Sequence, residues 1–170
     1  FADGEVISSI IPELVKNPSL GWDIRGAKIA SAKDFAVLAQ VLRTPYVETG
    51  KVVLLNQQNE VVHAEIISIG SLSSTNFEPR HLARVIANAP QVKGVYRVLI
   101  SHNHPSGDPS PSSADIRITK AMRETVEATG HEFLDHIVTN GDTYYSFREA
   151  GVSTPGGMSG ITRVSPKAQG

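Results

Sequence analysis

The sequence predicts a mixed α/β domain, with a central mixed β-sheet flanked by helices in a three-layer-like arrangement. Segments with apolar residues at helical spacing alternate with β-branched, apolar runs that are typical of strands. Their order is helix, hairpin, helix, strand, helix, hairpin, which fits one sheet with helices packed on its faces. The chain has 170 residues, of which 40% are hydrophobic and 19% charged, a composition typical of a globular domain with a core.

Each predicted element has its own signal. Apolar residues at helical spacing mark the helices, most clearly Ile118, Met122 and Val126. An N-cap at Ser31, a proline in a first turn and Gly130 after a last turn mark helix ends. Apolar runs bounded by polar turns mark the strands, and two pairs of them read as hairpins. In chain order we predict a helix at 32–43, strands at 51–56 and 61–70, a helix at 79–89, a strand at 95–101, a helix at 113–128, and strands at 132–138 and 143–147.

The two ends of the chain carry weaker signals. Residues 1–30 lack a clean period and contain two prolines, so we expect an N-terminal extension with at most a short edge strand at 26–30. The chain opens on Phe1, which suggests a fragment of a longer protein. Residues 152–170 show no pattern and are expected to form a flexible C-terminal tail. The predicted domain therefore covers 31–151.

Charge and cysteine content exclude several classes of protein. The net charge of −1 gives no basic field for binding nucleic acid. The absence of cysteine excludes disulfides and thiolate metal sites, leaving histidine and carboxylates as strong ligands. No apolar run reaches the length of a membrane span, and nothing resembles a signal peptide. We expect no membrane association and a cytoplasmic location.

The loop at 101–115 gathers the residues with the clearest chemistry. His102 and His104 follow a buried strand two positions apart, so they point to one side. The Pro- and Gly-rich segment after them must turn, and the next helix carries Asp115 in its first turn. Two imidazoles and one carboxylate suit a zinc ion with a fourth position open for water. The alternative is an ordinary turn, with Ser112 or Ser113 as the helix N-cap.

The order His-x-His-Pro, six residues, Ser, two residues, Asp resembles the metal motif of the JAMM (JAB/MPN-type) metalloproteases. The longer run SHNHPSGDPSPSSADI, together with LDHIV and YYSFREAG, resembles the RadC-like branch over 31–151. The resemblance implies a JAB/MPN-type fold of cytidine-deaminase-like architecture. It also implies a zinc peptidase or isopeptidase with His102, His104 and Asp115 as ligands.

Hydrolysis also needs a base, which accepts the proton of the attacking water and passes it to the leaving amine. In the resembled family this is a glutamate upstream of the histidines, on a neighbouring element. Glu65 is our choice, because it stands in an apolar strand and precedes a run similar to the family's. Glu60 is next, in the predicted turn, and Glu78 could instead cap a helix.

Two further residues stay open between two roles. Ser112 either caps the helix or, by resemblance, stabilises the oxyanion of the tetrahedral intermediate. Asp135 either orients a ligating histidine or closes a polar network at a strand end, and His136 is given no ligand role.

The expected function is zinc-dependent hydrolysis of a peptide or isopeptide bond in a protein or peptide substrate. A ubiquitin-like tail is one candidate, although Asn103 stands where deubiquitinating relatives carry Ser or Thr. The alternative is a RadC-type factor associated with DNA repair, which acts on or near nucleic acid. The oligomeric state is open.

Overall fold

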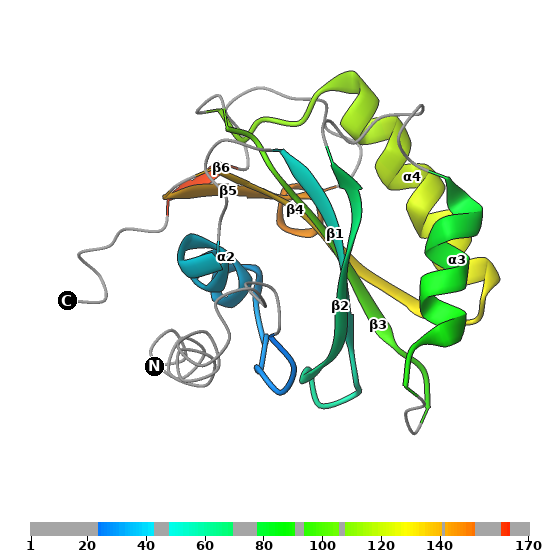
Figure 1. The fold of residues 1–170 in the computed structure, drawn as a ribbon. Coiled ribbons are helices and arrows are strands. Elements are labelled where there is room, and N and C mark those ends of the chain that lie inside the picture. Colours follow the sequence, from blue (N-terminus) through cyan, green and yellow to red (C-terminus); the bar gives the residue numbers. More distant parts are fainter. Residues whose placement is uncertain are drawn as a thin grey trace.

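A central sheet of six strands organises the computed structural model of the chain (Figure 1). The structure describes residues 24–42, 48–69, 78–90, 94–105, 108–140, 142–151 and 161–163. The strand order is β2-β1-β3-β4-β5-β6, and every neighbouring pair is antiparallel except β3 and β4. The elements are α2 (Ala32–Leu42), β1 (Thr49–Leu55), β2 (Val61–Ile69), α3 (Pro79–Asn88), β3 (Arg97–Asn103), α4 (Ser113–Ala128), β4 (Glu132–Asn140), β5 (Thr143–Ser146), α5 (Phe147–Ala150) and β6 (Ile161–Arg163).

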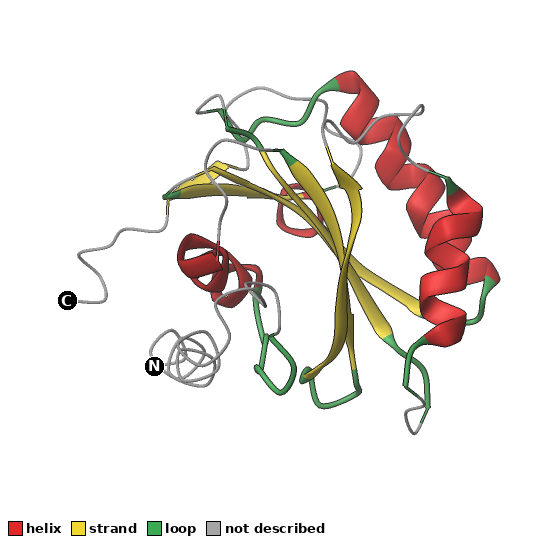
Figure 2. Cartoon of the chain, in the orientation of Figure 1, coloured by secondary structure: helices red, strands yellow, loops and turns green. Residues whose placement is uncertain are grey.

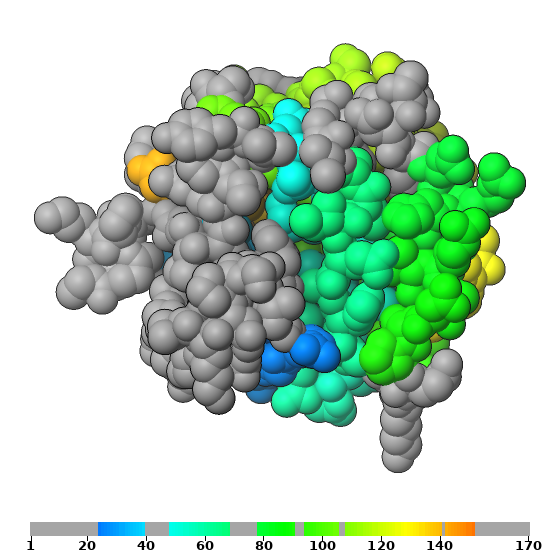
Figure 3. Space-filling model, in the orientation of Figure 1, coloured from blue at the N-terminus to red at the C-terminus, as the bar shows by residue number. Residues whose placement is uncertain are grey.

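The helices cover both faces of the sheet, as Figures 1 and 2 show. Successive side chains along a strand point to opposite faces of the sheet. Val53 and Leu55 of β1 therefore pack in one cluster with α2, whereas Val52 and Leu54 pack in a second cluster with α3 and α4. In the space-filling view, β2 and α3 lie side by side on one face of the molecule (Figure 3). The predicted mixed α/β class with a flanked central sheet is confirmed.

The one parallel pair, β3 and β4, decides where the functional residues meet. Parallel neighbours need a crossover connection, and here α4 provides it. The crossover places the carboxyl end of β3 next to the start of α4. Because β1 runs antiparallel to β3, with Gly50 opposite His102, the start of β1 lies at the same edge.

Two predictions for the ends of the chain are corrected by the structure. Residues 24–30 belong to the domain: Ile24 and Ala27 are fully buried in the α2 cluster, and the N–H of Gly26 donates to the carbonyl of Val61. They pair with the β1–β2 hairpin through a single bridge at Lys28. One bridge is too short to produce the alternating sequence pattern of a strand. Within the predicted tail, residues 161–163 form β6 against β5. No helix in the described parts of the chain is long and apolar enough to cross a membrane.

Candidate metal centre

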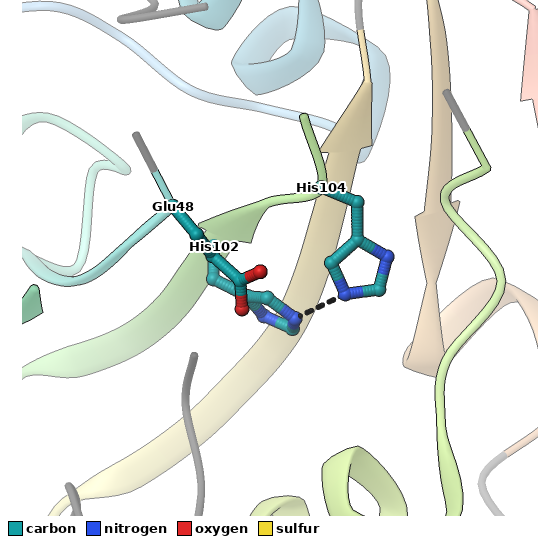
Figure 4. Close-up of side chains that lie close together, drawn as sticks. All are labelled: Glu48, His102 and His104. Carbon is teal, nitrogen blue, oxygen red and sulfur yellow. Dashed lines mark hydrogen bonds between the residues drawn. The ribbon is translucent and has the colours of Figure 1, made fainter. Parts of the chain in front are cut away.

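Two histidines meet at the carboxyl end of β3. His102 continues the alternation of Val98 and Ile100, so its ring points to the α4 side of the sheet and is fully buried. His104 follows just beyond the strand and is partly buried. The Nε2 atoms of the two rings lie 2.9 Å apart (Figure 4).

His104 is held by β4 although it lies outside the sheet. Its N–H donates to the carbonyl of Thr139 at 2.9 Å, and the side-chain amide of Asn140 donates to its carbonyl at 2.8 Å. Its Nδ1 lies 2.9 Å from the carbonyl oxygen of Asp108. Since a carbonyl only accepts, Nδ1 carries the proton, and in the neutral ring Nε2 presents its lone pair to His102.

Asp115 brings a carboxylate to both rings from the first turn of α4. Its Oδ1 lies 3.4 Å from Nε2 of His102, and its Oδ2 lies 3.4 Å from Nε2 of His104. The Ser112 N–H donates to Oδ2 at 2.8 Å, while the Asp115 N–H donates to the Ser112 hydroxyl at 3.0 Å, which completes a capping box.

Electrostatics hold this carboxylate ionised. Burial alone would raise the pKa of Asp115, but the close contacts with the His102 and His104 imidazoles outweigh burial and keep the pKa well below its usual value. Burial likewise opposes protonation of His104, yet contact with Asp115 raises the pKa of the imidazole.

The three side chains fit a divalent cation. Tetrahedral zinc with bonds of about 2.0–2.1 Å separates its ligand atoms by about 3.3 Å. Here the two Nε2 atoms lie 2.9 Å apart, and each lies 3.4 Å from a different oxygen of the Asp115 carboxylate, so the spacing is close to that of zinc ligands. Both rings present nitrogen, the carboxylate presents oxygen, and the chain has no cysteine to compete, so His102, His104 and Asp115 suit zinc.

A second carboxylate, that of Glu48, reaches the histidines from the start of β1. One of its oxygens and one ring nitrogen each from His102 and His104 lie within 4.8 Å of one another (Figure 4). Glu48 was not among the carboxylates predicted from the sequence. The available signal was its place directly before an antiparallel neighbour of β3, since the start of such a strand meets the end of β3.

Glu65, predicted as the base, lies elsewhere. Its Oε1 is 3.0 Å from Nε2 of His63 on the same strand, and 43% of its side chain is exposed. The register pairs it with Val52, so it lies two strands from the histidines and two residues away along the strand direction. An isolated ionisable residue in an apolar run marks a partly exposed position on the edge strand β2 here, not a polar cleft.

The other two glutamates that we weighed are also engaged elsewhere. Glu60 accepts a hydrogen bond at 2.9 Å from the side chain of Asn56 in the β1–β2 turn. Glu78 precedes α3 and lies 3.7 Å from Arg80, with no side-chain hydrogen bond to the helix end.

The structure places Asp135 away from the histidines, on the opposite face of the sheet. Its carboxylate accepts hydrogen bonds from the Ser146 hydroxyl at 2.5 Å, from the Arg148 N–H at 3.0 Å and from the His136 N–H at 2.7 Å. Asp135 thus closes a polar network at the start of α5. Burial raises its pKa to about 6.

His136, the next residue, faces the candidate metal centre. It is fully buried, and its Nε2 lies 2.8 Å from Nδ1 of His102. Burial first, and then the neighbouring His102, lower the pKa of His136 well below its usual value, so the ring is neutral.

Comparisons of the sequence with known proteins show the family of the chain. A UPF0758 protein of Alkaliphilus metalliredigens is 39% identical over 138 residues, which cover 81% of this chain and 58% of the relative. A UPF0758 protein of Clostridium acetobutylicum is 36% identical over 141 residues, which cover 82% of this chain and 60% of the relative. The chain thus spans less than two thirds of these relatives. Residues 29–152 match the RadC-like JAB domain family, and the chain belongs to that family.

Proposed function

We propose that the chain is a zinc-dependent hydrolase that cleaves peptide or isopeptide bonds. His102, His104 and Asp115 would hold the metal, and Glu48 would act as the general base. One observation carries the proposal: two imidazole nitrogens that lie 2.9 Å apart are each 3.4 Å from an oxygen of one carboxylate, and an oxygen of a second carboxylate lies within 4.8 Å of the ring nitrogens. When bound, zinc would supply Lewis acidity and lower the pKa of water towards neutrality.

The two carboxylates have different surroundings, which supports different roles. Asp115 is buried and fixed by the capping box, as a static ligand should be. Glu48 is partly exposed at a strand start and can reach solvent. A catalytic zinc site keeps one coordination position open, so the second carboxylate is better used as a base than as a fourth protein ligand.

Glu48 accepts the proton of the attacking water and returns it to the leaving amine. Ser112 assists the reaction without giving up its cap. Its oxygen accepts from the Asp115 N–H, so its hydroxyl proton remains available to donate to the oxygen of the scissile carbonyl.

The test uses Glu48→Gln and the matched control Glu65→Gln. We expect Glu48→Gln to bind zinc like the wild type and to lose hydrolysis of a peptide and isopeptide library by about 100-fold or more. Glu65→Gln should retain full activity, and His102→Ala should bind no zinc.

Three outcomes contradict the proposal. Loss of zinc from Glu48→Gln would make Glu48 a ligand. Loss of activity in Glu65→Gln, with activity retained in Glu48→Gln, would identify Glu65 as the general base. Zinc-dependent cleavage of DNA with no amide hydrolysis would favour the nucleic-acid alternative.

A further inference from the structure

We propose that Thr119 and His136 fix the position of the ring proton on His102, and so keep its Nε2 free to bind a metal. Thr119 and His136 are positioning residues in this inference, which rests on the metal site of the proposed function. The ring nitrogens of a neutral histidine are one donor and one acceptor, and a ligating nitrogen must be the acceptor.

A chain of three short hydrogen bonds runs through the buried layer between α4 and β4. The Thr119 hydroxyl lies 2.6 Å from the carbonyl oxygen of Asp115, and its oxygen lies 2.5 Å from Nδ1 of His136. The Nε2 of His136 then lies 2.8 Å from Nδ1 of His102. All three side chains are at most 1% exposed, so water does not compete for these bonds.

The direction of every bond follows from the backbone carbonyl at one end. The carbonyl of Asp115 only accepts, so the Thr119 hydroxyl donates to it. The Thr119 oxygen therefore accepts from Nδ1 of His136, which carries the ring proton. Nε2 of His136 is left as an acceptor, and Nδ1 of His102 must donate to it. The lone pair of His102 is thereby directed from Nε2 toward His104 and Asp115.

His104 needs no such relay, because the Asp108 carbonyl sets its proton directly. For His102, no described backbone carbonyl is shown within hydrogen-bond distance of Nδ1, and another imidazole occupies that position. An imidazole can accept or donate, so His136 alone does not determine which nitrogen of His102 carries the proton. The hydrogen bond between Thr119 and His136 determines it. The ring of His136 is also held flat against Phe147, with the ring planes 4° apart and the centroids at 4.8 Å.

The decisive variant is Thr119→Val, which keeps the shape of the side chain and removes the hydroxyl. The buried Nδ1 of His136 then loses its acceptor, so the proton should move to Nε2 and donate to His102. The His102 proton moves in turn to its own Nε2, where it opposes metal binding. We expect zinc affinity to fall by about 10- to 100-fold, as for other residues that orient metal ligands.

Two variants control for other effects. Thr125→Val removes a hydroxyl from the same helix, where Thr125 bonds the Ala121 carbonyl at 2.9 Å with no histidine attached. Thr119→Ser keeps the hydroxyl. Both should bind zinc within about threefold of the wild type, far less than the 10- to 100-fold loss expected for Thr119→Val.

The direct readout is the ¹⁵N chemical shift of the imidazole nitrogens in metal-free protein, with His102 assigned from the His102→Gln variant. We expect His102 to carry its proton on Nδ1 in the wild type and in Thr119→Ser, and on Nε2 in Thr119→Val. Zinc dissociation constants are measured in parallel by competition with a chelator.

A wild-type His102 protonated on Nε2 would overturn the inference. So would wild-type zinc affinity in Thr119→Val, or an equal loss in Thr125→Val. A protein that shows the expected tautomers and zinc affinities but hydrolyses no amide would instead refute the proposed function alone.

Discussion

Asp135 is a buried carboxyl group that we expect to make the stability of the fold depend on pH. Its side chain is 4% exposed, and its carboxylate accepts three hydrogen bonds from Ser146, Arg148 and His136. Those bonds favour the ionised form, but burial outweighs them and raises the pKa from 3.8 to about 6. We predict that Asp135→Asn removes one component of the pH dependence of unfolding.

The sign and size follow from linkage. The folded state holds this proton more tightly than the unfolded state, so the stabilisation is fully present below pH 3.8 and is lost as the pH rises through about 6. At about 1.4 kcal/mol per pKa unit, the loss amounts to about 3 kcal/mol.

The assay is urea unfolding between pH 3.5 and 7.5. The difference in unfolding free energy between wild type and Asp135→Asn should change by about 3 kcal/mol across this range, since other titrating groups cancel in the difference. Glu127→Gln, on the exposed side of α4, is the control and should show a nearly constant difference. A constant difference for Asp135→Asn as well would refute the reasoning.

Two further predictions concern the metal centre. Asn103→Ala should lower the unfolding free energy by about 1–3 kcal/mol, because its Oδ1 accepts from both the N–H and the hydroxyl of buried Thr49. The same variant should lower hydrolysis more than zinc affinity, because Thr49 adjoins Glu48; wild-type stability in urea would contradict the first part. Zinc at about 1,000 times its dissociation constant should raise the unfolding free energy by about 4 kcal/mol. A chelator should reverse this gain, His102→Ala should abolish it, and a gain that persists in His102→Ala would place the ion elsewhere.

The loop from β3 to α4 could be read from the sequence because its signals are local. His102 and His104 are two positions apart at a strand end, and Ser112 and Asp115 have the spacing of a capping box. The helix at 113–128 was predicted with the bounds that α4 has. Its N-cap residue Ser112 and Gly130, which marks its end, both lie within two residues of the helix in the sequence.

Glu48 and the role of His136 could not be found in the same way. Both depend on which strands pair. Thr49 meets Asn103 across 54 positions, and His136 meets His102 across 34. A periodicity shows which residues face one side of a strand, but not which strand lies beside it. Glu65 was preferred because it interrupts an apolar run, a pattern that an exposed edge position produces equally well.

The parallel pairing of β3 with β4 also has a consequence for how the protein matures. His102, His104, Asp115, Thr119 and His136 all lie within the continuous β3–α4–β4 segment, 97–140. Glu48 joins them only when β1 pairs with β3, where Thr49 and Asn103 are 54 positions apart, against 34 positions between His102 and His136. Short loops close at a lower entropic cost than long ones. Pairing of β3 with β4 therefore costs less loop-closure entropy than pairing of β1 with β3, and we expect the side chains of the candidate metal centre to gather before Glu48 reaches them.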